Sequence, residues 1–66
     1  MKNNIRVERA ILQISQAELA EKVQVTRQTI NAIELGKYAP SAVLAMKIAK
    51  VFGKAVEEVF QLEEND

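Results

Sequence analysis

Two helix-start signatures, at Ser15 and Thr26, constrain this chain more than any other feature of its sequence. Ser15 stands three residues before Glu18, and this Ser-x-x-Glu spacing is the capping box of a helix N-terminus. The apolar residues that follow have the i, i+1, i+4 spacing of an amphipathic helix, which predicts a helix over residues 16–23: Leu19, Ala20 and Val23. Thr26 is an N-cap residue for a second helix. Only residues 24–26 remain for the turn, so we expect two short helices that cross steeply.

The next two helices are delimited by glycine and proline. Ile30 and Ile33 form the apolar stripe of a helix predicted over residues 27–35, and Gly36 supplies its left-handed stop. Pro40 prevents the chain from being helical just before Ser41, which caps a longer helix that Gly53 ends. The inward residues of that longer helix share helical spacing: Leu44, Ala45, Ile48, Ala49 and Phe52.

The two ends of the chain predict shorter helices. Residues 6–12 read as a first helix, although the apolar positions there are too many to define one buried face: Ile5, Val7, Ala10, Ile11 and Leu12. After Gly53, apolar residues at helical spacing predict a short fifth helix: Val56, Val59 and Phe60. Five helices joined by turns of two to five residues predict one all-α domain spanning residues 1–66.

Composition excludes several classes of protein. With 66 residues, 48% of them apolar and 27% charged, the chain is neither disordered nor a membrane protein, and no signal peptide is recognisable. There is no cysteine and no histidine, which excludes a disulfide framework, a thiolate or imidazole metal site and a Ser–His–Asp triad. We therefore expect no cofactor, no metal and no enzymatic activity. So short a chain is marginally stable alone, which favours a homo-oligomer.

The formal net charge of zero hides an asymmetry. Residues 1–54 hold all nine basic residues and four acids, whereas residues 55–66 hold five acids and no base. The first part therefore carries +5 and the second −5. We expect the basic part to face a polyanion and the acidic end to lie away from it.

The helix-turn-helix unit of residues 16–35 suggests which polyanion. The first turns of its second helix carry side chains that suit base edges: Arg27, Gln28, Thr29 and Asn31. Arginine pairs with guanine O6 and N7, and Gln or Asn pairs with adenine N6 and N7. A helix in the major groove reads bases with its N-terminal residues, so this pattern predicts DNA binding.

Three segments resemble the Cro/C1-type (Xre-like) family of helix-turn-helix regulators. They are Gln-Ala-Glu-Leu-Ala at 16–20, Thr-Arg-Gln-Thr-Ile at 26–30 and Gly-Lys-Tyr-Ala-Pro-Ser at 36–41. The resemblance covers essentially the whole chain and is closest to short, stand-alone members such as the cytolysin-operon repressor of Gram-positive bacteria. It implies a homodimer of five-helix protomers, with a small antiparallel sheet formed by strands at residues 3–5 and 60–63.

The resemblance also implies roles for single residues. The base-reading positions are Arg27, Gln28, Asn31 and Ala32. The positions that contact or position phosphate are Gln16, Thr26, Thr29, Lys37 and Tyr38. Arg9 and Glu34 match a partly buried ion pair that ties the first helix to the third.

The dimer interface is expected in the C-terminal region, residues 55–66. Its apolar residues are more than a core of this size requires, which leaves some for a partner copy: Val56, Val59, Phe60 and Leu62. Val43 and Met46 lie off the inward face of their helix and can join this interface.

The chain departs from the family pattern at three positions. Gln24 stands in the turn, and Gln13 stands at the end of the first helix, where the family usually has glycine. Both must therefore adopt a left-handed or otherwise strained conformation. Ala55 replaces the usual Ser or Thr cap, so the fifth helix is expected to start loosely.

These features predict a cytoplasmic, nucleoid-associated, homodimeric repressor that binds an inverted-repeat operator and senses no small molecule. Two alternatives stay open. One is the DNA-binding antitoxin of a toxin–antitoxin pair, and the other is a protein-interaction module on the same fold. The sequence does not identify the operator, the regulated genes or the sign of regulation.

Overall fold

The computed structural model describes all 66 residues and contains five helices and one two-stranded antiparallel sheet. The elements, in chain order, are β1 (Lys2–Asn3), α1 (Ile5–Leu12), α2 (Gln16–Val23), α3 (Arg27–Glu34), α4 (Ala42–Phe52), α5 (Val56–Val59) and β2 (Phe60–Gln61). This architecture confirms the predicted fold class.

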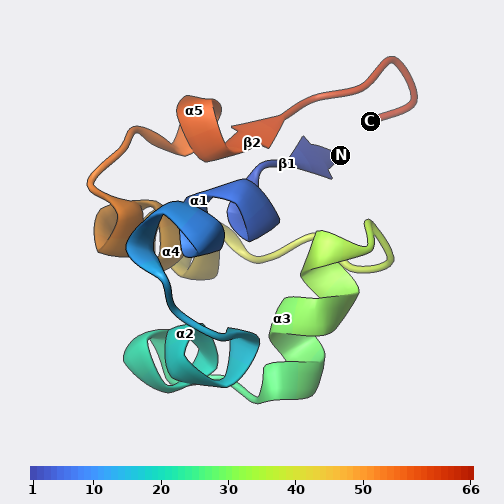
Figure 1. The fold of residues 1–66 in the computed structure, drawn as a ribbon. Coiled ribbons are helices and arrows are strands. Elements are labelled where there is room, and N and C mark those ends of the chain that lie inside the picture. The colour runs from blue at the N-terminus through green and yellow to red at the C-terminus, as the bar shows by residue number, and fades with distance from the viewer.

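The elements form three tiers in Figure 1. The α2–α3 pair occupies one end, α1 and α4 lie in the middle, and α5 lies with the small sheet at the other end. The pair α2 and α3 has the most extensive mutual packing of any two elements. The helix-turn-helix unit thus forms one end of the molecule. The two chain termini lie at the opposite end, with α1 and α4 in between.

The predicted caps start three helices. The hydroxyl oxygens of Ser15, Thr26 and Ser41 accept hydrogen bonds from backbone N–H groups three residues on, at 3.0, 3.2 and 3.2 Å. In the capping box, Glu18 Oε1 also accepts from the backbone N–H of Ser15 at 2.9 Å. These bonds satisfy backbone donors that a helix start otherwise leaves free, so they fix where α2, α3 and α4 begin.

Two glutamines occupy the left-handed region, as their positions in the sequence predict. Gln13 ends α1 with φ 57° and Gln24 ends α2 with φ 63°. Each donates its backbone N–H to carbonyl groups in the preceding turn, so the helix C-terminus is closed as glycine would close it. The cost is steric, because a Cβ crowds the backbone in this conformation.

The core is a single cluster of thirteen buried apolar residues: Ile5, Leu19, Ala20, Val23, Ile30, Ile33, Leu44, Ala45, Ile48, Ala49, Phe52, Val59 and Phe60. Every element except β1 contributes to it. The buried face of α1, which the sequence left undefined, consists of Ile5 and Glu8, whereas Val7 and Ile11 are exposed. Glu8 is buried with a charge partner, because Lys54 Nζ lies 2.8 Å from its Oε2.

The sheet is shorter than predicted, and its register pairs Lys2 with Gln61 and Asn3 with Phe60. The expected strand at residues 3–5 is wrong beyond Asn3, because Asn3 Oδ1 accepts the backbone N–H of Ile5 at 3.2 Å and starts α1 there. The second strand ends at Gln61 instead of residue 63, because β1 begins at Lys2 and offers no residue that pairs with the chain after Gln61.

Three helix boundaries also differ from the predictions. The first helix begins at Ile5 instead of Arg6, and α3 ends at Glu34 with Leu35 as its C-cap. The fifth helix ends at Val59, because Phe60 is extended and pairs in the sheet. Ala55 makes no side-chain cap, as expected, but Glu58 Oε1 accepts its backbone N–H at 3.0 Å, which holds the start of α5 from the other side.

Candidate nucleic-acid interface

One face of α3 is polar and exposed while the opposite face is buried. Arg27, Gln28 and Asn31 are exposed, and Ala32 is half-buried beside them. Ile30 and Ile33 are buried in the core and fix the helix from behind. Residues 27 and 31, and residues 28 and 32, are four apart and therefore neighbours on one helix surface. The four residues predicted to read bases thus lie together.

Thr26 and Thr29 lie at the N-terminus of α3. Thr26 Oγ1 accepts the backbone N–H of Thr29 and also lies 3.0 Å from Thr29 Oγ1. Their hydroxyl groups are engaged with each other and with the cap, so both residues position the start of the helix. Arg27 follows directly, at the tip of α3 that points away from the sheet (Figure 1).

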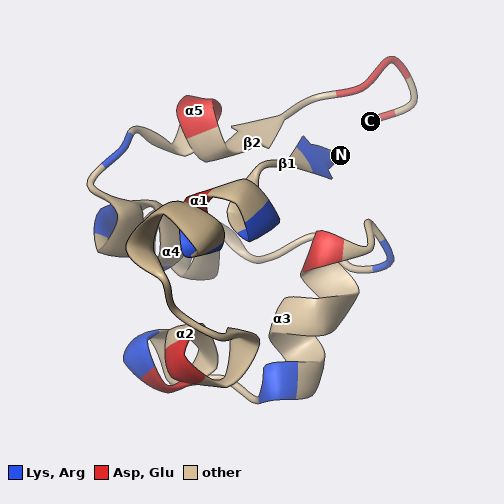
Figure 2. Cartoon of the chain, viewed as in Figure 1, with Lys and Arg blue, Asp and Glu red and all other residues tan.

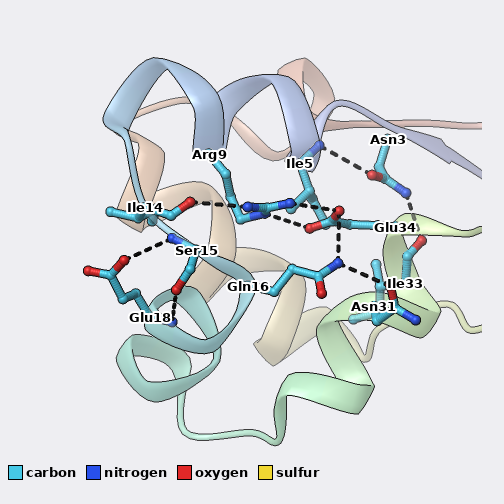
Figure 3. A network of polar contacts seen from close by, with 10 residues as sticks. All are labelled: Asn3, Ile5, Arg9, Ile14, Ser15, Gln16, Glu18, Asn31, Ile33 and Glu34. Carbon is cyan, nitrogen blue, oxygen red and sulfur yellow. Dashed lines mark hydrogen bonds and ion pairs between the residues drawn. The ribbon is translucent and has the colours of Figure 1, made fainter.

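A hydrogen-bonded chain connects α1, α2 and α3 beside this face (Figure 3). Arg9 Nε donates to Glu34 Oε2 at 2.7 Å, and Arg9 Nη2 donates to Glu34 Oε1 at 3.1 Å. This two-point contact is the strong geometry for an arginine–carboxylate pair. It raises the pKa of Arg9, because the Glu34 carboxylate accepts hydrogen bonds from its charged form. Arg9 and Glu34, which were expected to tie the first helix to the third, therefore form an ion pair between α1 and α3.

Gln16 extends this hydrogen-bonded chain to the exposed polar face of α3. Its Nε2 donates to Glu34 Oε1 at 3.2 Å and to Asn31 Oδ1 at 3.1 Å. An amide nitrogen carries two hydrogens, so both donors of Gln16 are used inside the protein. The sequence placed Gln16 and Asn31 at two separate kinds of contact and did not indicate that they bond to each other. Their helical positions, one at the start of α2 and the other within α3, are the only sequence signal that they are neighbours.

The N-terminus of α2 retains donors that point out of the helix. The backbone N–H groups of Gln16 and Ala17 have no partner within the protein. Such free amides at a helix N-terminus favour a phosphate. The phosphate contact predicted at this position therefore has backbone donors available, even though the Gln16 side chain is engaged.

Lys37 and Tyr38 lie in the loop after α3, and both are exposed. Gly36 precedes them with φ 74°, a left-handed conformation that glycine adopts without a steric cost and that turns the chain sharply. This turn places a charged and a hydroxyl-bearing side chain at the C-terminal end of α3. The predicted phosphate contacts therefore stand at both ends of the helix-turn-helix unit.

The acidic C-terminal part of the chain lies away from the α2–α3 end of the molecule, as the sequence predicts. The acidic residues of α5 and of the C-terminal segment lie at the end opposite α2 and the tip of α3, where Arg27 stands (Figure 2). Glu63 and Asp66 pair there with the Met1 amino group at 3.0 and 3.2 Å. The pKa of Asp66 is lowered, chiefly because its carboxylate accepts the backbone N–H of Glu63.

The apolar residues expected at a dimer interface fall into two groups. Val59 and Phe60 are buried in the core of the single chain, so only Val56, half-buried, and Leu62, 81% exposed, are open to a partner. Val43 and Met46 are 64% and 63% exposed on α4. Together with Val56 they line an open groove of about 740 Å³ between α4 and α5, with lysines at its rim: Lys47, Lys50 and Lys54.

No group of three acidic residues stands close enough together to hold a metal ion. None of the helices has the length and apolar character that crossing a membrane requires.

The family model described as "Helix-turn-helix" matches residues 5–59, which include all five helices. The chain belongs to the Cro/C1-type helix-turn-helix family. This membership confirms the resemblance that the three sequence segments indicate. The narrower likeness to the cytolysin-operon repressor stays a prediction.

Relatives from bacteria and archaea match along the full chain. The uncharacterized HTH-type transcriptional regulator YgzD of Bacillus subtilis is 52% identical over 66 residues and is covered completely, as is this chain. An uncharacterized HTH-type transcriptional regulator of Methanocaldococcus jannaschii is 50% identical with the same complete coverage. Another from Methanothermobacter thermautotrophicus is 48% identical, covering 98% of this chain and 96% of the relative.

Proposed function

We propose that this chain is a sequence-specific DNA-binding transcriptional regulator that acts as a homodimeric repressor. The observation that carries the proposal is the exposed polar face of α3, with Arg27, Gln28 and Asn31 on one surface and Ile30 and Ile33 buried behind it. The names of the relatives, all HTH-type transcriptional regulators, support it.

In the proposed complex α3 lies in the major groove. Arg27, Gln28 and Asn31 face base edges, and Ala32 contributes an apolar contact of the kind that thymine methyl groups accept. The free backbone amides at the start of α2 bind one phosphate, and Lys37 and Tyr38 bind another beyond the far end of α3. Contacts on both sides of the recognition helix fix its register on the duplex.

The dimer forms through the groove between α4 and α5. The same surface of a second copy of the chain packs against it. A two-fold interface needs a self-complementary surface, and here apolar residues and lysines line the groove while glutamates lie on the adjoining α5. Lys50, on the rim, and Glu57, on α5, form no ion pair within the protein. Two-fold pairing brings the lysines of one copy toward the α5 glutamates of the other while Val43 and Met46 become buried.

A two-fold dimer requires an inverted repeat with half-sites about 10–10.5 bp apart, centre to centre. Repression is then steric, because the bound dimer occupies promoter DNA. The protein acts at the nucleoid, in the cytoplasm. Its ligand is double-stranded DNA, and the proposed mechanism uses no small molecule.

Selection from random double-stranded oligonucleotides tests this proposal. We expect an enriched inverted repeat with the stated spacing, and an affinity for it that falls steeply with salt, because binding releases counterions from several phosphates. A protein that enriches no sequence and binds DNA with little salt dependence contradicts the proposal. That outcome favours instead a protein-interaction module on this fold.

A further inference from the structure

We propose that Gln16 and Glu34 set the base preference of Asn31 by fixing which end of its side-chain amide faces the DNA. This inference rests on the proposed DNA-binding function and assigns Glu34 as a positioning residue in it. The orientation of the Asn31 amide depends on which atoms can donate and which can accept along one hydrogen-bonded chain (Figure 3).

Arg9 fixes Glu34 as an acceptor. Its carboxylate receives two hydrogen bonds from the Arg9 guanidinium, at 2.7 and 3.1 Å, and an ionised carboxylate has no hydrogen to donate. The Glu34 side chain is only 7% exposed, so water does not compete freely for its oxygens. Any side-chain amide that faces Glu34 must therefore present its nitrogen.

Glu34 in turn fixes the orientation of the Gln16 amide. Its Nε2 faces Glu34 Oε1 at 3.2 Å, and turning the amide over would put two oxygen acceptors against each other. The second hydrogen of Nε2 is then aimed at Asn31, 3.1 Å away. Because that partner must accept, Asn31 presents Oδ1 to Gln16.

Gln16 then fixes which atoms Asn31 offers to DNA. With Oδ1 directed at Gln16 on α2, the Nδ2 group and its two hydrogens are the part of the amide left for a base. Asparagine ordinarily pairs with adenine by accepting from N6 and donating to N7. An Asn31 that presents donors favours instead guanine, which offers the acceptors O6 and N7.

The same chain changes the role expected of the Gln16 side chain. Both hydrogens of its Nε2 are used by Glu34 and Asn31, so the side chain has no donor left for a phosphate. The backbone N–H groups at the start of α2 remain available for that contact. Gln16 therefore acts on base recognition through Asn31.

The test has two stages, both with the full-length protein and random double-stranded oligonucleotides. Selection with Asn31→Ala identifies the base pair that residue 31 reads, as the position whose preference is lost. At that pair we expect the unmodified protein to prefer guanine over adenine about tenfold. We expect Gln16→Ala to reduce this preference to about twofold, because the Asn31 amide is then free to turn over.

Gln28→Ala is the matched control, since Gln28 is a glutamine at this interface that is exposed and, unlike half-buried Gln16, belongs to no hydrogen-bonded chain. It is expected to alter a different base position and leave the guanine preference intact. A merely structural role for Gln16 lowers affinity for all sequences alike and does not alter the base chosen at one position.

Measurements on the free protein separate this inference from the proposed function. In NMR spectra we expect slowed exchange of the Gln16 Nε2 hydrogens, and faster exchange in Glu34→Gln, whose neutral side chain no longer dictates the orientation. Adenine preferred at the residue-31 position, or a guanine preference that survives Gln16→Ala, overturns the inference and leaves DNA binding standing. A protein that enriches no sequence overturns the inference together with the proposed function, even if the free-protein spectra show the bonded amide.

Discussion

Arg9 and Glu34, on α1 and α3, form a two-point ion pair across 25 residues of chain. Their side chains are 16% and 7% exposed, so the pair is largely withdrawn from water. Glu34 also accepts from Gln16, which makes the carboxylate a junction of three helices. The pair therefore bears on both the stability of the fold and the geometry of the proposed recognition surface.

Removing the arginine should destabilise the protein strongly. We expect Arg9→Met to lower the free energy of unfolding by about 3 kcal/mol, because it leaves the Glu34 carboxylate buried without a counter-charge. Urea unfolding followed by circular dichroism measures the change. The control is Arg6→Met, an exposed arginine on the same helix that forms no ion pair, expected within about 0.5 kcal/mol of the unmodified protein. A loss below about 1 kcal/mol for Arg9→Met contradicts the prediction.

Replacing the left-handed residue Gln24 by glycine should stabilise the protein. Gln24 holds φ 63°, and Gln24→Gly should raise the free energy of unfolding by about 0.5–1 kcal/mol. Glycine removes the steric cost of the Cβ, and part of the gain is offset by its greater freedom in the unfolded chain. Gln24→Ala retains the Cβ and serves as the control, with no gain expected. Equal stability changes for the two variants would show that strain at this residue is not the cause.

The capping box predicts an acid-dependent contribution to stability. The pKa of Glu18 is lowered, first because its carboxylate accepts the backbone N–H of Ser15 and second through the Ser15 side chain. A lowered folded-state pKa means that the contribution is complete above the unfolded value, about 4.3, and is lost as pH falls through the folded value. Urea midpoints between pH 7 and pH 3 should fall less for Glu18→Gln than for the unmodified protein.

The matched control for this pH series is Glu21→Gln, on the same helix and outside the capping box. It should follow the unmodified protein across the whole range. If Glu18→Gln and the unmodified protein show parallel curves, the capping carboxylate does not contribute the predicted pH dependence.

Base contacts and phosphate contacts should be separable by mutation. Arg27→Ala is expected to cost about 1–3 kcal/mol at one base position and to relax specificity there. Lys37→Ala should weaken all sequences alike and reduce the slope of log affinity against log salt by about 1. Competition binding on the selected operator and its single-base variants distinguishes the two. Uniform losses for both variants would contradict the assigned roles.

The groove between α4 and α5 should control oligomeric state. Met46→Glu places a charge on its apolar floor and is expected to convert the dimer to monomers in sedimentation experiments at micromolar concentration, with a weaker affinity for the inverted repeat. Val7→Glu is the control, because Val7 on α1 is 59% exposed, close to the 63% of Met46, and lies outside the groove. An unmodified protein that sediments only as a monomer, or a dimer that survives Met46→Glu, rejects this interface.

Most of the fold was predictable because its helix ends are set by short-range chemistry. Ser15, Thr26 and Ser41 bond to backbone three residues away, so their effect is readable from the local sequence. The left-handed conformations of Gln13 and Gln24 were predictable from the resemblance, because the family usually has glycine at these two positions. The sheet boundaries were less predictable because the Asn3 side chain competes with the strand for the backbone of Ile5.

The sequence by itself determined the helix-turn-helix unit, the polar character of the exposed α3 face and the separation of basic and acidic parts, since all three depend on spacing along the chain. Only the tertiary structure decided that Val59 and Phe60 belong to the protomer core and that Gln16 bonds to Asn31. Both outcomes depend on contacts between residues distant in sequence, whose partners are set by how the helices pack. An amide carries the same atoms in any protein, and its packed neighbours decide whether it offers a donor or an acceptor.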